Sequence, residues 1–223
     1  RAFNQMAGNL ARMDEDRALI LAGVSHDLRT PLARLRLEAE MSVQDEEAKK
    51  NMAMDIDQLD AIIDKFMDYA RPGETLLRPV LLSPLVDREA QAFRDPSEIR
   101  IESQLAIDLQ VLADDTELGR VFANLFENAR RYGRSTDTGI AKVVVTYART
   151  GPWVILSVRD YGPGVDPAKL GQLTTPFFRG DAARTAATGA GLGLAIVEKA
   201  MQRMGGQVEV ANAPDGGLML HIR

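Results

Sequence analysis

His26 is one of only two histidines in the 223-residue chain, and the side chains around it are of types that do chemistry. Asp27 follows it directly, and Thr30 lies four residues on, on the same face of a predicted helix. A carboxylate that accepts a hydrogen bond from one ring N–H leaves the other nitrogen as a more basic lone pair. Pro31 has no backbone N–H, so the carbonyl of Asp27 loses its helical partner and the helix should bend there. The pattern indicates an exposed nucleophile; the alternative is a surface histidine among ordinary charged neighbours.

A second group of polar residues lies on a helix predicted over residues 114–132. Asn124 and Asn128 are four residues apart and project from one edge of its apolar stripe, and Arg131 follows one turn later. Two amide oxygens and a cation on one ridge suit a hydrated Mg²⁺ and the phosphates that it carries. Asparagine is a poor helix former, so two of them in mid-helix need a reason. A solvated helix edge is the alternative.

Two glycine-rich stretches follow. Asp160 ends a predicted strand and precedes Gly162 and Gly164, which permit a tight turn and the close approach of a flat ligand. The carboxylate could accept a hydrogen bond from an exocyclic amine such as that of adenine, although such a run alone is usually just a turn. Residues 188–194 open a helix, where clustered backbone N–H groups bind phosphates. This is not a Walker A loop, because no Gly-Lys-Ser/Thr follows.

The segment between these two stretches has the composition of a mobile lid, rich in Gly, Ala and Thr. Phe177 and Phe178 are expected to anchor this lid rather than to contact a ligand. Arg179 could reach a terminal phosphate or could simply be solvated.

The overall composition excludes several classes of protein. A formal net charge of −5 and a pI of about 5.2 offer no broad basic surface, so nucleic acid is not an expected partner. The chain has no cysteine, which excludes disulfides and thiolate metal sites. No apolar run approaches the roughly 18 residues of a membrane-spanning helix, so we do not expect this segment itself to be embedded in a membrane. Because the chain starts at Arg1 without a signal-like segment, we expect it to be a fragment.

Residues 1–70 have the pattern of two helices joined at 42–45, with Asp45 or Ser42 as the N-cap of the second. On each helix a seam recurs at alternating spacings of three and four, as in heptads. The seam positions are Ala18, Leu21, Ser25, Leu28, Leu32, Leu35 and Ala39, then Met52, Ile56, Leu59, Ile63, Phe66 and Ala70. Two narrow seams bury little surface, so we predict a homodimer in which two hairpins form a four-helix bundle. The alternative is a hairpin that packs on the downstream domain.

From about residue 79 helices and strands alternate. We predict helices over 83–93, 114–132 and 192–204, the first with Ser83 as N-cap and Pro84 at its first position. Strands are predicted over 99–103, 109–113, 141–148, 153–160, 207–211 and 218–222. The fold class is therefore an all-α hairpin followed by an α/β domain, with a sheet covered on one face by helices. His221 is expected to be an ordinary surface residue of the last strand.

Together, and in this order, these stretches resemble the sequence boxes of the sensor histidine kinases of two-component systems, in particular the EnvZ-like ones. Residues 26–32 resemble the H box, 124–132 the N box, 160–164 the G1 box, 177–180 the F box and 189–194 the G2 box. Each box is weak alone, but the ordered set is specific and covers nearly the whole chain. The resemblance implies a dimeric phosphotransfer hairpin followed by an ATP-binding α/β sandwich of the Bergerat type, shared with gyrase, Hsp90 and MutL.

The resemblance also implies roles for single residues. His26 would accept the γ-phosphate of ATP, Asp27 would activate its imidazole, and Thr30 would orient water for dephosphorylating a partner. That partner would be the receiver domain of a response regulator, which takes the phosphoryl group on an aspartate. Asn124 and Asn128 would hold Mg²⁺, and Asp160 would read adenine. The implied nucleotide contacts are Asn124, Asn128, Arg131, Tyr132, Asp160, Gly162, Gly164, Arg179, Gly189, Gly191, Leu192 and Gly193.

The chain departs from the family pattern at two places. Ala190 stands where the family usually has threonine, and we expect nucleotide binding to be retained because this box acts mainly through backbone N–H groups. Arg130 and Arg131 replace a commoner single basic residue, so the sequence does not decide which of the two arginines meets phosphate. Two other classes compete with a kinase: an ATPase machine that never phosphorylates itself, and a signalling scaffold with an inactive kinase domain.

The same resemblance predicts how the chain is divided. Residues 1–14 would end an upstream signalling helix of the HAMP type, 15–71 would form the dimerisation and phosphotransfer hairpin, 72–78 a linker and 79–223 the catalytic domain. The parent protein would be an inner-membrane sensor, with this region in the cytoplasm.

Overall fold

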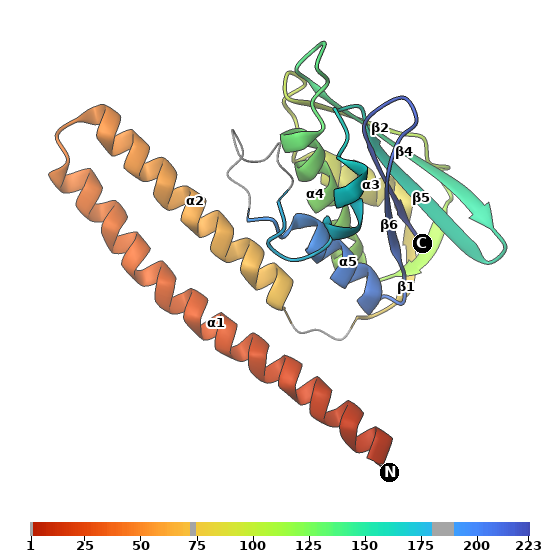
Figure 1. Cartoon of the computed structure of the whole chain (residues 1–223). Helices are drawn as coiled ribbons and strands as arrows, with labels where there is room; N and C mark the ends of the chain where they lie inside the picture. Colours follow the sequence, from red (N-terminus) through yellow and green to blue (C-terminus); the bar gives the residue numbers. More distant parts are fainter. Residues whose placement is uncertain (1, 72–74, 180–189) are drawn as a thin grey trace. The chain divides into compact units, whose positions relative to one another are not determined.

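The computed structural model describes residues 2–71, 75–179 and 190–223. It divides into two compact units, Arg1–Glu74 and Thr75–Arg223, and each is described here by itself. Figure 1 shows a helical hairpin in the first unit and helices on a sheet in the second. Among the described residues, no helix is long and apolar enough to cross a bilayer.

The first unit consists of α1 (Ala2–Ser42) and α2 (Glu46–Ala70). Asp45 caps α2, because its Oδ1 accepts hydrogen bonds from the backbone N–H groups of Glu47 at 2.9 Å and Ala48 at 3.1 Å. Of the two N-caps that the sequence allowed, the structure selects Asp45. Helix α1 runs as one element through Pro31.

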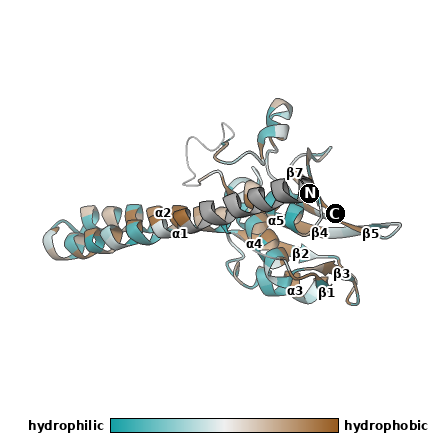
Figure 2. Ribbon diagram, turned by 90° about the horizontal axis from the view of Figure 1, so that it is seen from below, coloured by the Kyte–Doolittle hydropathy of each residue, from teal (hydrophilic) through white to brown (hydrophobic). Residues whose placement is uncertain are grey.

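The seam between α1 and α2 is buried along one edge only. Ser25, Leu32 and Ala39, each seven residues from the next, are buried. Leu28 and Leu35 lie on the other edge and remain 47% and 48% exposed. Figure 2 shows polar and apolar residues alternating along both helices. One hairpin therefore covers half of its own seam.

Ion pairs between α1 and α2 follow a single register. Arg29 pairs with Asp64, and Arg36 Nη1 lies 2.6 Å from Asp57 Oδ1. Seven residues forward on α1 correspond to seven residues back on α2, as an antiparallel pair requires. Because all four side chains are about half exposed, each pair contributes about 0–1 kcal/mol, and apolar burial stabilises the hairpin more.

The second unit holds two sheets. The elements in chain order are β1 (Arg78–Leu81), α3 (Leu82–Ala90), β2 (Ile99–Ser103), β3 (Gln110–Ala113), α4 (Asp115–Tyr132), β4 (Ala141–Thr150), β5 (Trp153–Asp160), the 3-10 helix η1 (Pro167–Gln172), α5 (Gly193–Arg203), β6 (Val208–Asn212) and β7 (Leu218–Ile222). The main sheet has the order β2-β4-β5-β7-β6, with β2 parallel to β4 and the other neighbours antiparallel. Strands β1 and β3 form a separate antiparallel pair.

Helices α3, α4 and α5 lie on one face of the main sheet, which confirms the predicted α/β layer (Figure 1). The core between them contains the fully buried Phe122 and Phe126 of α4. The ring of Phe93 meets that of Phe126 edge-on, with centroids 5.9 Å apart. From the sheet, Val143 and Val145 point into this core at alternate positions of β4.

The start of α3 was predicted wrongly. The helix begins at Leu82, its N-cap is Leu81, and no side chain caps it. Ser83 and Pro84 therefore lie inside the first turn, where a missing N–H at Pro84 leaves no helical bond unmade. The helix ends at Ala90 rather than near Phe93. The pairing of β1 with β3 and the short helix η1 were not predicted.

Candidate active site

His26 and Asp27 are exposed side by side on α1. Their side chains are 84% and 86% exposed, and His26 Nδ1 lies 3.6 Å from Asp27 Oδ1. That distance is an ion-pair contact rather than a formed hydrogen bond. Thr30, one turn later, directs its Oγ1 to the carbonyl oxygen of His26 at 3.5 Å. The imidazole is therefore open to an approaching molecule and lies next to a carboxylate.

In the second unit, Asn124 is buried on α4 and only 3% exposed, so a solvated helix edge does not describe it. Its Nδ2 donates to the carbonyl of Arg120 at 2.8 Å. This bond turns Oδ1 toward the start of α5, where a Cβ on Gly193 would lie 3.9 Å from it. Asn128 is half-buried one turn later on the same helix.

Carboxylates hold the two arginines at the end of α4. Arg130 donates from Nε to Glu127 Oε2 at 2.9 Å, from Nη2 to Glu127 Oε1 at 2.9 Å and from Nη1 to Glu98 Oε2 at 3.0 Å. Arg131 Nε donates to Glu127 Oε1 at 2.5 Å. Burial raises the pKa of Glu127, but the bonds from the two arginines outweigh it and hold that pKa below its usual range. The carboxylates of Glu127 and Glu98 therefore occupy three of the five N–H donors of Arg130.

Asp160 lies at the end of β5 with its carboxylate buried, 7% exposed. Its Oδ1 accepts backbone hydrogen bonds from Gly162 at 3.0 Å and Leu218 at 3.0 Å. Among the described residues, no hydrogen bond is made to Oδ2. Burial raises the pKa of this carboxyl, and the two N–H donors offset that rise in part.

Three glycines pack closely at Asp160, at positions where a larger residue would collide with its side chain or with the neighbouring backbone. A Cβ on Gly133, at the end of α4, would lie 2.7 Å from the Cβ and Cγ of Asp160. A Cβ on Gly162 would lie 2.7 Å from Gly133, and one on Gly217 would lie 2.0 Å from the carbonyl oxygen of Asp160. The end of α4, the loop after β5 and the turn before β7 are therefore in backbone contact around one carboxylate.

Asn212 fixes the loop that carries Gly162 and Gly164. Its Oδ1 accepts from the N–H of Val165 at 2.9 Å, and its Nδ2 donates to the carbonyl of the same residue at 2.5 Å. Gly164 has φ +72°, and a Cβ there would meet Asn212 Oδ1 at 2.9 Å. The side-chain amide thus ties this loop to β6.

The start of α5 is joined to the segment around Phe177. Gly191 has φ +68°, accepts a hydrogen bond from the N–H of Phe177 at 2.9 Å, and has no room for a Cβ beside the backbone of Phe177 and Phe178. Phe177 itself has φ +64° and is 59% exposed. Within the described part of the chain no side chain caps α5 at Leu192, and the first backbone N–H groups of a helix can bind an anion.

The remaining predicted site residues differ in how exposed they are. Leu192 is buried, 1% exposed, so only its backbone is available to a ligand. Tyr132 is half-buried and Arg179 is exposed. Gly189 lies outside the described residues.

Sequence reasoning missed three residues that shape this site: Gly133, Asn212 and Gly217. Gly133 directly follows the predicted helix, where a glycine normally signals only a helix end. Asn212 and Gly217 lie between the two strands predicted over 207–211 and 218–222, where polar residues and glycines normally signal only a connection. None of these signals points to Asp160, because the contacts join segments far apart in the chain.

Two features of the described residues suit a nucleotide that carries a metal ion. The Asp160 carboxylate is bonded to two backbone N–H groups through Oδ1, whereas no described residue bonds Oδ2, and the buried Asn124 presents an amide oxygen near the start of α5. Among the described residues, no group of three or more histidine, aspartate or glutamate side chains is placed to hold a metal. A metal would therefore be held by amide and phosphate oxygens.

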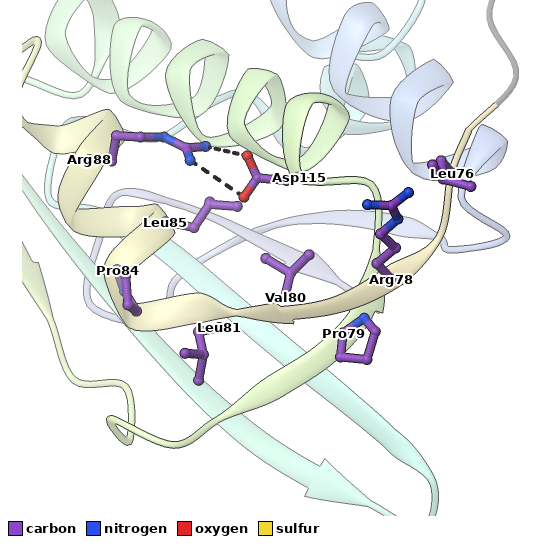
Figure 3. A pocket seen from close by; sticks show the side chains of 9 residues that line it. All are labelled: Leu76, Arg78, Pro79, Val80, Leu81, Pro84, Leu85, Arg88 and Asp115. Carbon is purple, nitrogen blue, oxygen red and sulfur yellow. Dashed lines mark hydrogen bonds and ion pairs between the residues drawn. The ribbon is translucent and has the colours of Figure 1, made fainter.

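A separate pocket of about 470 Å³ lies between β1, α3 and the start of α4. Figure 3 shows Arg88 paired with Asp115 at its edge, with Nη2 3.0 Å from Oδ2. None of the predicted site residues lines it. The lining residues are Leu76, Arg78, Pro79, Val80, Leu81, Pro84, Leu85, Arg88 and Asp115.

Two protein families match the chain. The His Kinase A (phospho-acceptor) domain matches residues 16–75, and the histidine kinase-, DNA gyrase B- and HSP90-like ATPase matches residues 113–223. Together they cover most of the chain.

The curated relatives and solved structures that resemble this chain include sensor proteins and sensor histidine kinases. The chain is 35% identical to the sensor protein RstB and 32% identical to the sensor histidine kinase CpxA, both of Escherichia coli K12, over 97% and 99% of its length. It spans about half the length of each, 50% in both cases. The crystal structure of full-length ShkA in complex with AMPPNP covers 92% of this chain and 45% of its own, with a TM-score of 0.70 and 26% identity. The mycobacterial sensor histidine kinase MprB has a TM-score of 0.55 and 29% identity, over 66% of this chain and 95% of its own. With an exposed histidine in one unit and a glycine-lined site of the ATPase fold in the other, the chain belongs to the sensor histidine kinases as a catalytic region.

Proposed function

We propose that this chain phosphorylates itself on His26 with ATP and passes the phosphoryl group to an aspartate of a response regulator. The observation that carries the proposal is the exposed imidazole of His26 beside Asp27, within the segment that matches the phospho-acceptor domain. A structural histidine gains nothing from 84% exposure. A phosphoryl carrier requires it, because a donor and then an acceptor must reach the same nitrogen.

The side chains divide the phosphorylation step between them. Asp27 lies on the Nδ1 side of the ring, and an N–H held there leaves Nε2 as the nucleophile. Nε2 attacks the γ-phosphorus, the bond from phosphorus to the bridging oxygen breaks, and ADP leaves with that electron pair. The contact of 3.6 Å shortens when the ring gains positive charge, since the carboxylate then pairs with a cation.

In the second unit the residues bind and orient ATP. Asp160 accepts a hydrogen bond from the exocyclic amine of adenine through the oxygen that no described residue occupies. Arg131, Tyr132 and the N–H groups at the start of α5 bind the phosphates. Asn124 and Asn128 hold Mg²⁺, which neutralises phosphate charge when bound.

The later steps involve a second protein. A phosphorus–nitrogen bond to imidazole is reactive and suits onward transfer to a carboxylate. Thr30, one turn from His26 on the exposed side of α1, would orient water to dephosphorylate the regulator, which adds a phosphatase activity. We further propose that two hairpins pair through the seam edge of Leu28 and Leu35, because that apolar edge stays open in one chain.

We also propose how this chain is divided into domains. Residues 1–14 end a HAMP-like helix, 15–71 form the phosphotransfer hairpin, 72–78 the linker and 79–223 the catalytic domain. The parent would be an inner-membrane sensor with this region in the cytoplasm.

Labelling with γ-labelled ATP tests the proposal. The chain with Mg²⁺ should acquire an acid-labile label, and addition of a receiver domain should move the label to that domain. His26→Gln should abolish labelling, whereas His221→Gln is a matched control that should keep it, because His221 lies in β7 bonded to Ser157 at 2.8 Å. Label that persists in His26→Gln would show that another residue is the acceptor. A chain that binds ATP without becoming labelled would support the ATPase or scaffold alternatives.

A further inference from the structure

Arg159 lies directly before Asp160 on β5 and points to the opposite face of the sheet, because successive strand residues alternate. Asp160 shares its face with Leu156 and Val158, which belong to the core between the sheet and the helices. The Arg159 side chain is nevertheless only 22% exposed. It is therefore covered by other parts of this unit, and these parts are the loop after β5 and the turn before β7.

The first contact is with Tyr161. The Arg159 guanidinium carbon lies 4.3 Å from the centroid of the Tyr161 ring, and Lys142 Nζ lies 5.3 Å from the same centroid. Both distances are within the cation–π range of about 6 Å. Tyr161 stands between Asp160 and Gly162, whose N–H donates to Asp160 Oδ1. The stacked ring therefore restrains the backbone that supplies one of the two donors.

The second contact is with the turn between β6 and β7. Arg159 Nη2 donates to Asp215 Oδ1 at 2.5 Å and to the carbonyl of Gly216 at 3.1 Å. Two residues further on, the N–H of Leu218 is the other donor to Asp160 Oδ1. One guanidinium thus holds both segments whose backbone N–H groups bind the Asp160 carboxylate.

We propose that Arg159 is a positioning residue for recognition of the nucleotide base, acting through Asp160 without touching the nucleotide. This inference rests on the proposed function, in which Asp160 reads the exocyclic amine of adenine. Two donors on Oδ1 direct Oδ2 into the site. Guanine carries an oxygen where adenine carries this amine, so a firmly placed carboxylate repels guanine and a loosely placed one does not.

Equilibrium competition of ATP and GTP against a fluorescent ATP analogue tests this inference on the whole chain. The parent chain should bind ATP more tightly than GTP. Arg159→Gln should weaken ATP binding by about tenfold, the change expected when the displaced carboxylate largely loses its hydrogen bond from the exocyclic amine. GTP binding should change by less than about twofold, so that discrimination falls. Arg159→Lys keeps a cation over Tyr161 and should recover part of the discrimination.

Two further variants complete the test. Arg149→Gln removes an exposed arginine near the far end of β4 and should leave both affinities unchanged. Asp215→Asn weakens one of the two anchors and should lower discrimination by a smaller factor, which tests the inference even where Arg159→Gln fails to fold. If the Arg159 and Asp215 variants lose equal affinity for ATP and GTP, or keep the parent's ratio of the two affinities, the positioning role of Arg159 is refuted. The proposed reading of adenine by Asp160 would be unaffected by that result. A parent chain that binds no nucleotide, or does not prefer ATP, would overturn the proposed reading of adenine and this inference with it.

Discussion

Replacing Gly133 with alanine adds a single methyl group directly against the Asp160 carboxyl. The added Cβ would lie 2.7 Å from the Cβ and Cγ of Asp160 and 2.9 Å from the carbonyl oxygen of Ala129. Gly133 has φ −94°, so the change introduces no left-handed strain and its whole effect is steric. None of these atoms is the free end of a flexible side chain, so the backbone or the carboxylate must shift. Overpacking of this kind costs about 1–3 kcal/mol.

For a chain of this size each kcal/mol lowers Tm by about 2–4 °C, so Gly133→Ala should lower the Tm of the second unit by about 2–12 °C. Because the displaced group is Asp160, ATP affinity should fall by about tenfold or more in the protein that remains folded. Thermal unfolding and ATP titration at a temperature well below both transitions measure the two effects separately.

Gly171→Ala is the matched control for Gly133→Ala. Gly171 lies in η1, and a Cβ added to it would meet no atom within 4 Å, so alanine there should change stability by less than about 1 kcal/mol and leave ATP binding unchanged. If Gly133→Ala matches the parent chain in both Tm and ATP affinity, the result contradicts a close contact between the end of α4 and Asp160.

Asp160→Asn should raise Tm at pH 7 and weaken ATP binding, because burial raises the pKa of this carboxyl and its ionisation therefore opposes folding. The sign follows from the raised folded pKa: the gain in Tm should be full above that pKa and disappear as the pH falls below the ordinary value of 3.8, and a gain that grows toward low pH would contradict it. Asn212→Leu removes both hydrogen bonds to Val165 and should lower stability by about 1–3 kcal/mol and weaken ATP binding, measured by unfolding in urea and by titration; unchanged unfolding would show that the loop is held otherwise. Leu35→Asn should shift the chain from dimer toward monomer in sedimentation, whereas the same change at Ile107, 83% exposed in the second unit, should not; equal behaviour of the two variants would exclude the proposed seam edge.

Local patterns in the sequence were enough to predict most elements of the fold. Strand β5 and helix α4 are close to their predicted ranges, because alternation and helical periodicity are set by burial on one face. Helix α3 begins two residues before the predicted first position, Pro84, and the N–H of Leu82 donates to the carbonyl of Leu109, a long-range contact that no capping pattern encodes. Pairing of β1 with β3 depends on the same kind of contact.

In the candidate site, too, some features could be predicted from the sequence and others could not. Residue types and their order were enough to predict His26, Asn124 and Asp160 as site residues, since the capacity to act as a nucleophile, a metal ligand or a hydrogen-bond acceptor belongs to the side chains themselves. The sequence left open which of Arg130 and Arg131 meets phosphate. In the structure Arg130 donates a hydrogen bond to Glu98, which lies far from both arginines in the chain.

The inventory of chemical groups, and most of the secondary structure that carries them, follow from local sequence patterns. The surroundings of Asp160 arise only when distant segments pack together. Gly133 and Gly217 come from distant segments and pack against the side chain and the backbone of Asp160, and Arg159 holds the two donor segments from the other face of the sheet. Burial, backbone contact and the orientation of a carboxylate are properties of packed atoms, and a linear pattern does not contain them.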